Sequence, residues 1–194
     1  MASDSYLQRL FSLKGKAALV TGASGGLGRA MAVALAGAGA QIGIHGTNPE
    51  RLEQTRQAVE EVGGTGVVLP ASLEDAAQCQ KLAADAQSVL GRIDVLLNCA
   101  GTNGRKLIDT VTEEEFDWII SVNLRSAFFL SQAVHPMMRE QGGGKIINIG
   151  SMTSLLGFAN LSVYGMTKSA LAQATKSMAI EWAPDNIQVN CVAP

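Results

Sequence analysis

A tyrosine and a lysine stand four residues apart in the segment YGMTKSALAQATKSMAIEWA, as Tyr164 and Lys168. Ala, Leu, Met and Lys dominate this segment and its larger apolar residues recur at helical spacing, which predicts a helix. Side chains four residues apart on a helix share one face, about 6 Å apart along the axis. A cation beside a phenol lowers the pKa of the phenol and makes it a better acid or base near neutral pH. The alternative is an ordinary helix face with a packed phenol and a solvated amine.

Two polar residues that precede this pair are further candidates for chemistry. Ser151 follows the apolar run KIINIG, so the hydroxyl is expected at the end of a strand, where it can stabilise charge on a substrate oxygen. Asn123 falls inside a long predicted helix, where asparagine is a poor helix former. The plain alternatives are a turn or cap residue for Ser151 and a solvent-facing side chain for Asn123.

A glycine-rich turn follows the first apolar run of the chain. In VTGASGGLGRAMA, Gly22, Gly26 and Gly28 form a TGxxxGxG pattern. Glycine lets the backbone approach a ligand closely, and the N-terminus of the next helix favours a phosphate group. The spacing differs from the GxGxxG dinucleotide fingerprint, and no GK[ST] follows, which argues against a nucleoside triphosphatase. The turn therefore predicts a phosphate-binding loop.

The elements that must position these residues alternate along the chain. Apolar runs predict strands at 17–22, 41–46, 65–71, 93–101, 145–150 and 187–194, and helical patterns cover 27–39, 49–63, 73–91, 112–140 and the segment from Tyr164. Apolar strands separated by helices indicate a parallel sheet with helices on both faces. We predict an α/β, doubly wound fold in one domain, residues 1–194.

Several of these motifs together resemble the short-chain dehydrogenase/reductase family. TGASGGLG, NCAG, SVNL, INIGS, YGMTK and VNCVAP follow the order and spacing of that family from about Lys14 to the end, with Tyr164 thirteen residues after Ser151. Cys99 replaces the second Asn of the NNAG motif of the family. The resemblance implies a Rossmann fold and hydride transfer between a nicotinamide and a carbonyl or alcohol carbon.

The resemblance also implies roles for individual residues. Tyr164 would be the acid/base and Lys168 would lower its pKa and bind the nicotinamide ribose, while Ser151 would hold the substrate oxygen. Asn123 would position a water that links Lys168 to solvent. The implied cofactor contacts, besides Tyr164 and Lys168, are Gly22, Ser24, Gly26, Leu27, Gly28, Thr47, Asn48, Ser72, Asn98, Ala100 and Gly101.

The cofactor is expected to be NAD(P), with a preference for NADP. An NAD site carries an acidic residue after the second strand, and here Gly46 is followed by Thr47 and Asn48. No carboxylate there would repel the 2′-phosphate of NADP. Many NADP-dependent relatives carry an Arg at one of two positions, which Thr47 and Gly25 occupy here. Ser72 stands where the family often has an Asp that contacts adenine.

The expected substrate is a sugar acid such as gluconate or ketogluconate. Arg105 and Lys106 follow the fourth strand and are candidates to bind a carboxylate, unless they are simply solvated. The segments FSLKGKAALVTGASGGLGRA, NLRSAFFLSQAV and GGGKIINIGSMTSLLG resemble the gluconate 5-dehydrogenase and 2-deoxygluconate dehydrogenase branch. They also resemble 3-oxoacyl-carrier-protein reductases, so an acyl carrier substrate is the alternative. A regulator or scaffold that binds the cofactor without turnover is the alternative from another class.

Composition excludes several other classes of protein. The net charge is −2 and no Lys/Arg run occurs, which argues against a nucleic-acid or membrane-surface partner. No apolar run reaches the ~18 residues of a membrane span, and no secretory signal is evident, so a cytoplasmic location is expected. The three Cys and two His residues lack metal-ligand spacing, so no metal is expected. The resemblance implies a homotetramer, and relatives continue beyond Pro194, so we expect that a C-terminal part is missing.

Overall fold

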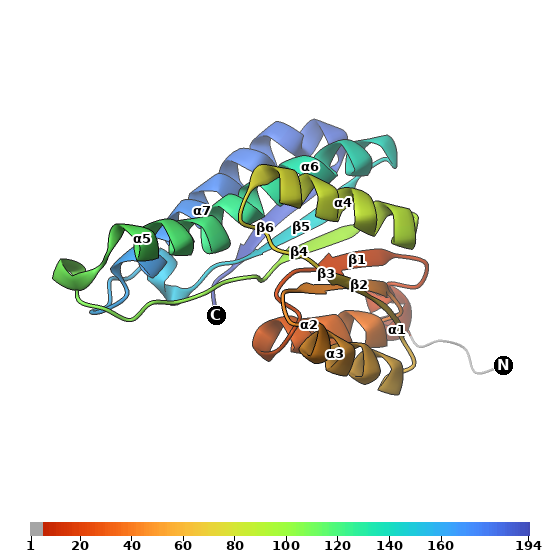
Figure 1. Cartoon of the computed structure of the whole chain (residues 1–194). Coiled ribbons are helices and arrows are strands. Elements are labelled where there is room, and N and C mark those ends of the chain that lie inside the picture. Colours follow the sequence, from red (N-terminus) through yellow and green to blue (C-terminus); the bar gives the residue numbers. More distant parts are fainter. Residues whose placement is uncertain (1–5) are drawn as a thin grey trace.

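Six parallel strands form one sheet at the centre of the molecule in a computed structural model that describes residues 6–194 (Figure 1). The strand order is β3-β2-β1-β4-β5-β6. The strands are β1 (Ala17–Val20), β2 (Gln41–Gly46), β3 (Thr65–Pro70), β4 (Val95–Asn98), β5 (Gly144–Ile149) and β6 (Ile187–Val192). The helices are α1 (Tyr6–Phe11), α2 (Gly26–Gly37), α3 (Pro49–Glu61), α4 (Ala76–Leu90), α5 (Glu113–Ile120), α6 (Ser126–Glu140) and α7 (Ser162–Trp182). The predicted doubly wound α/β fold is confirmed.

Helices cover the two faces of the sheet in separate groups (Figure 1). α2 and α3 lie on one face, where Ala32, Leu52 and Val59 form a core cluster with side chains of the strands. α4, α6 and α7 lie on the other face, where Leu82, Leu130 and Met178 belong to a second cluster. The central strands β1 and β4 are buried along their whole length, which explains why their sequences are continuous apolar runs rather than alternating ones.

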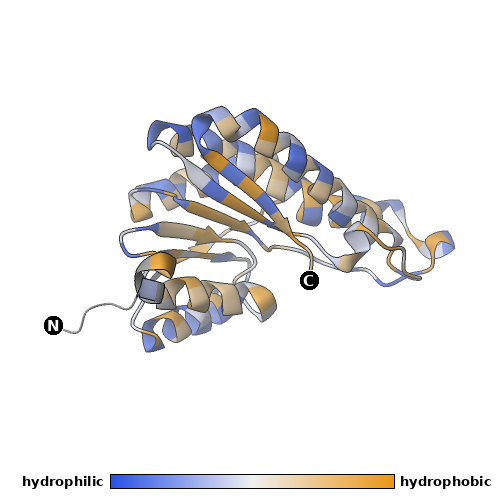
Figure 2. Ribbon diagram, turned by 180° about the vertical axis from the view of Figure 1, so that it is seen from behind, coloured by the Kyte–Doolittle hydropathy of each residue, from blue (hydrophilic) through white to orange (hydrophobic). Residues whose placement is uncertain are grey.

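The edge strand β6 differs from the central strands. Its burial alternates, with Ile187 and Val189 buried and Gln188, Asn190 and Val192 exposed. Figure 2 shows the same alternation between hydrophobic and hydrophilic residues along this strand. In the described part of the chain, β6 is therefore covered on one face only.

The helix predicted over 112–140 is one helical stretch with an irregular centre. Thr112 caps α5 through a reciprocal pair of hydrogen bonds with Glu115. A five-residue π-helix (Ser121–Arg125) then separates α5 from α6. π-segments inside α-helices often occur at functional sites, and this one carries Asn123, which lies in its middle.

The carboxyl ends of the strands lie at one edge of the sheet, and the loops there carry most of the candidate residues. β1 and β4 are neighbours at the point where the strand order reverses. In open α/β sheets, ligands bind outside the carboxyl ends of the strands at such a switch point. The fold thus brings the loop at Gly22 next to the loop at Ala100.

Candidate active site

Thr21 and Gly22 join the loops after β1 and β4. The hydroxyl of Thr21 accepts hydrogen bonds from the backbone N–H groups of Cys99 and Ala100, each 3.0 Å long. Gly22 has a φ of +66°, and a Cβ built on it would lie 2.8 Å from the backbone of Ala100. Only glycine fits here without displacing the neighbouring loop, because any side chain would collide with backbone atoms.

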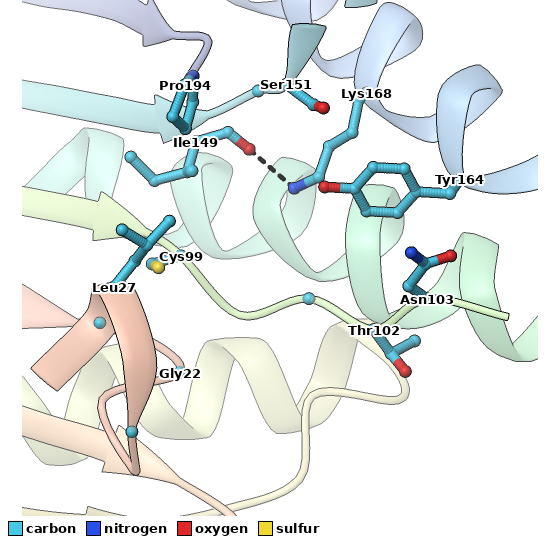
Figure 3. Close-up of a pocket in the computed structure, with 14 residues that line it drawn as sticks. Gly22, Leu27, Cys99, Thr102, Asn103, Ile149, Ser151, Tyr164, Lys168 and Pro194 are labelled. Carbon is cyan, nitrogen blue, oxygen red and sulfur yellow. Dashed lines mark hydrogen bonds between the residues drawn. The ribbon is translucent and has the colours of Figure 1, made fainter. Parts of the chain in front are cut away.

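A cavity of about 400 Å³ opens between these two loops, β5 and the first turns of α7. Ser151, Tyr164 and Lys168 line it together with Gly22, Leu27 and Gly28 of the glycine loop. Figure 3 shows the hydroxyls of Ser151 and Tyr164 and the amine of Lys168 at this cavity. Ser151, Tyr164 and Lys168, which span 17 positions in the sequence, are therefore gathered beside the glycine loop.

Lys168 is held firmly from the strand side. Its Nζ donates a 2.7 Å hydrogen bond to the carbonyl of Ile149, and it lies 5.7 Å from the centroid of the Tyr164 ring. The residue is only 4% exposed. Burial lowers the pKa of the Lys168 amine, and the nearby thiols of Cys99 and Cys191 oppose this change. The helix spacing read from the sequence thus places a buried amine beside the phenol.

Ser151 sits where the loop after β5 turns into a short 3₁₀ helix, Met152–Ser154. Its Oγ accepts a 3.2 Å hydrogen bond from the backbone N–H of Thr153. The hydroxyl of Ser151 donates to no group among the described residues, so its hydrogen is available to a ligand in the cavity. Ser151 therefore caps the 3₁₀ helix, as the alternative interpretation predicts, and it also lines the cavity.

Asn123 is buried and fixes the loop after β4. Its Oδ1 accepts from the backbone N–H of Thr102, and its Nδ2 donates to the Thr102 carbonyl and to the hydroxyl of Thr167. The residue is 1% exposed, so the solvent-facing alternative is wrong. Since both hydrogens of Nδ2 are engaged, the side chain could bind a water only through Oδ1, which accepts one hydrogen bond here.

A second cavity of about 290 Å³ shares Gly22, Gly101 and Thr102 with the first. Its other walls come from the glycine loop, the end of β2, the loop after β3 and α5. The residues that line it include Ser24, His45, Gly46, Thr47, Ser72, Leu73, Glu74, Ala100, Trp118 and Val122. The two cavities adjoin at these three shared residues, and we refer to the pair as the cleft.

The sequence of residues 16–194 matches the family model described as short chain dehydrogenase. The chain belongs to the short-chain dehydrogenase family. As a member of this family, the protein is an NAD(P)-dependent oxidoreductase.

Two proteins of this family are each 42% identical to the chain. One is a tropinone reductase homologue from Arabidopsis thaliana, matched over 95% of this chain and 70% of its own length. The other is the 2-dehydro-3-deoxy-D-gluconate 5-dehydrogenase of Bacillus subtilis, matched over 97% of this chain and 74% of its own length.

Solved structures of the family superpose closely on this short-chain dehydrogenase. A gluconate 5-dehydrogenase from Burkholderia cenocepacia, in complex with NADP and tartrate, gives a TM-score of 0.92 at 33% identity, covering 97% of this chain and 74% of that one. A 3-oxoacyl-(acyl-carrier-protein) reductase from Agrobacterium tumefaciens with NADP bound gives 0.93 at 31% identity, covering 100% and 75%. The resemblance to both branches is confirmed.

The cleft of this short-chain dehydrogenase fits a nicotinamide dinucleotide. A Cβ on Gly28 would lie 2.2 Å from the carbonyl oxygen of Gly22, so glycine lets α2 start close against the loop, and a Cβ on Gly25 would meet nothing within 4 Å. α2 begins at Gly26, and its first N–H groups could bind a pyrophosphate. The first cavity, with Lys168 and Tyr164, would take the nicotinamide end, and the second would take the adenosine end.

Three residues expected at the site have other partners. The side chain of Asn98 is 4% exposed and donates to Ser131 and Asn148, so it joins β4 to α6 and β5 rather than lining either cavity. Asn48 caps α3, with its Oδ1 accepting from the N–H of Arg51. Lys106 forms a 2.5 Å ion pair with Glu115.

The other expected substrate residue, Arg105, is exposed and lines neither cavity. The loop after β4 instead presents Thr102 and Asn103 to the first cavity. These two residues carry no motif, so only the path of the loop identifies them. Across residues 6–194, no group of three or more His, Cys, Asp or Glu side chains is placed to hold a metal ion. None of the helices there has both the length and the apolar character that a bilayer crossing requires.

Proposed function

We propose that this short-chain dehydrogenase interconverts a secondary alcohol and a ketone on a sugar acid, with Tyr164 as the acid/base. The observation that supports this most directly is that Tyr164, Ser151 and Lys168 line one cavity with the glycine loop. The 42% identity to a 2-dehydro-3-deoxy-D-gluconate 5-dehydrogenase supports the class of substrate. So does the likeness to a gluconate 5-dehydrogenase that binds tartrate, a small hydroxy acid.

Each side chain has a defined part in this reaction. The bound nicotinamide supplies or accepts the hydride. In the reductive direction the Tyr164 hydroxyl gives its proton to the carbonyl oxygen, and in the oxidative direction the phenolate removes the alcohol proton. The Lys168 cation near the ring favours the phenolate. The hydroxyl of Ser151 donates a hydrogen bond to the same substrate oxygen and stabilises the negative charge that develops there.

A kinetic screen of the whole protein tests the proposal. Oxidation of NADPH and NADH is followed with 5-ketogluconate, a 3-ketogluconate analogue, tropinone and an acetoacetyl thioester. We expect the highest kcat/KM with a ketogluconate. A preference for the thioester would favour the acyl carrier alternative, and a preference for tropinone would exclude the sugar acid. Tight cofactor binding with no turnover of any carbonyl would favour the regulator.

We propose that NADP is the preferred cofactor. Gly46, at the end of β2, and Thr47 line the second cavity without a carboxylate, so that part of the wall does not repel a 2′-phosphate. The guanidinium of Arg29 donates to the carbonyl of Ser24 in the same wall and adds positive charge nearby. Glu74 is the acidic residue of this cavity, and it is exposed on the loop after β3.

Gly46→Asp is expected to reverse this preference. The new carboxylate would repel the 2′-phosphate and accept hydrogen bonds from the ribose hydroxyls of NAD. We expect at least a ~10-fold rise in the Kd for NADPH, about 1.4 kcal/mol, measured by titration calorimetry with NADPH and NADH. Gly46→Asn is the matched control, because it adds nearly the same volume beside Leu52 and Ser24 without a charge. Equal effects of both variants on the two cofactors would contradict a charge-based preference.

We also propose a homotetramer in the cytoplasm. Large apolar side chains are exposed on two long helices, with Phe128 on α6 at 41% and Met166 and Ile180 on α7 at 52% and 77%. Burying these side chains against a twin would remove apolar surface from water. Light scattering on the whole protein is expected to give four times the chain mass, and a monomer at micromolar concentration would exclude the assembly. Cell fractionation checks the location.

A further inference from the structure

One wall of the second cavity carries an aromatic side chain that the catalytic chemistry does not use. Trp118 of α5 lines this cavity, and Val122 lines it one helical turn later. Residues four apart share a helix face, so the two side chains form one apolar strip. The rest of the lining includes Gly22, Ser24 and Thr47.

This apolar strip is fixed against the loop after β3. The hydroxyl of Ser121 donates a 2.7 Å hydrogen bond to the carbonyl of Glu74, which joins the end of α5 to that loop. Ser72 and Leu73 of the same loop line the cavity beside Trp118. The cavity therefore has an aromatic and aliphatic wall with hydroxyl groups next to it, which suits a flat heteroaromatic ring with polar edges.

The exposure of Trp118 points to a ligand. Its side chain is 51% exposed although it stands at a cavity. A large aromatic surface left in water at a cavity gains free energy when a ligand covers it. An indole ring can stack on a purine ring, because every base has a flat aromatic face. Such stacking contributes substantially to the binding of nucleotides.

We infer that Trp118 packs against the adenine ring of the cofactor and is a binding determinant for the adenosine half. The inference rests on the proposed placement of the adenosine end in the second cavity. The nicotinamide half would bind in the first cavity, so a fragment that contains only one half of the cofactor tests one cavity at a time. The fragments are adenosine 2′,5′-bisphosphate and nicotinamide mononucleotide.

Tryptophan fluorescence reports the contact directly. The chain has two Trp residues, and the other, Trp182, stacks on His135 with ring centroids 4.6 Å apart, away from both cavities. In Trp182→Phe, emission comes from Trp118 alone. We expect adenosine 2′,5′-bisphosphate and NADP to quench this emission and nicotinamide mononucleotide to leave it unchanged. Trp118→Phe is expected to lose the quenching.

Affinity provides the second readout, measured by calorimetry on the whole protein. Trp118→Ala is expected to weaken adenosine 2′,5′-bisphosphate about 10-fold, and Trp118→Phe about 3-fold or less because a ring remains. Circular dichroism at 222 nm checks that each variant is folded. Unchanged affinity in folded Trp118→Ala, with the wild type binding the fragment, would overturn the stacking alone. A wild-type protein that binds NADP but not the fragment would overturn the proposed adenosine cavity and the stacking with it.

Discussion

The amine of Lys168 illustrates how much a single residue depends on its surroundings. Its side chain runs from α7 to the carbonyl of Ile149 at the end of β5, and burial lowers its pKa. The hydrogen bond holds the amine 5.7 Å from the centroid of the Tyr164 ring, so the side chain does not have to be ordered from solvent. In the proposed mechanism this charge would be preorganised for a proton transfer at Tyr164.

Tyr164→Phe is expected to reduce kcat roughly 100- to 10,000-fold, because it removes the hydroxyl that handles the proton and leaves the ring in place. Cofactor affinity, measured by calorimetry, should change little. Tyr6→Phe is the matched control, since Tyr6 is 70% exposed on α1. Residual activity above about a tenth of wild type would count against Tyr164 as the acid/base.

At this scale the sequence predicts the spacing of residues within one helix better than it predicts contacts between elements. The YxxxK spacing places Tyr164 and Lys168 correctly because a helix fixes the geometry of residues four apart. Asn98 and Lys106 could not be placed in the same way, since their partners Asn148 and Glu115 lie on other elements, whose packing against them local spacing does not determine. Trp118 carries no motif, and only its position on α5 shows that it reaches the cavity.

Among the elements, the glycine loop is the most constrained. It must turn from β1 into α2 while its backbone passes close to the loop after β4. A Cβ on Gly28 would lie 2.2 Å from the carbonyl oxygen of Gly22, whereas a Cβ on Gly25 meets nothing within 4 Å. The φ of Gly25 is 172°, an extended conformation open to any residue. Two glycines of one loop are therefore under different constraints.

Gly28→Ala is expected to lower the free energy of unfolding by about 1–3 kcal/mol and to weaken cofactor binding, because the loop must move to admit the methyl group. Gly25→Ala is the control and should leave the free energy of unfolding within about 0.5 kcal/mol of wild type. Urea unfolding with a fluorescence readout measures both. Similar losses in the two variants would indicate a general loss of loop flexibility instead of a steric conflict.

The order and type of the elements follow from the sequence, but the centre of the long helix does not. Apolar runs and caps predict the six strands and the helices between them within a few residues. The π-segment Ser121–Arg125 lies in a normal helical pattern. It is present where the Asn123 side chain bonds to the backbone of Thr102, a tertiary contact that local propensity cannot report.

On the scale of the whole molecule, stability is linked to a buried histidine. His45 is 2% exposed and its Nε2 lies 3.2 Å from the carbonyl of Ala71. Burial lowers the pKa of His45 from 6.5 to about 4, with the Ala71 contact acting in the opposite direction. Between those two pH values the unfolded chain binds a proton that the folded chain does not, so stability falls as the pH decreases.

His45→Gln is expected to make stability less dependent on pH in this window. From pH 7 to pH 5 the wild type should lose about 2 kcal/mol more free energy of unfolding than the variant, because Gln does not titrate. Urea unfolding at several pH values measures the difference. The wild type and the variant contain the same carboxylates. Any difference between the pH dependences of their free energies of unfolding therefore comes from His45. Parallel pH curves would contradict a depressed pKa at His45.

The bonds of Asn98 also bear on how the strands align. Asn98 and Asn148 are opposite each other in the register of β4 and β5, and Asn148 donates onward to Thr175 of α7. A slip of β5 by one residue would turn Asn148 to the opposite face of the sheet and leave several buried polar groups unpaired. Each unpaired buried group costs about 1–3 kcal/mol. With apolar residues at both positions, a slipped strand would not pay this penalty. The Asn98–Asn148 pair thus favours the correct register of β4 and β5, and it does so during folding, before any ligand is bound.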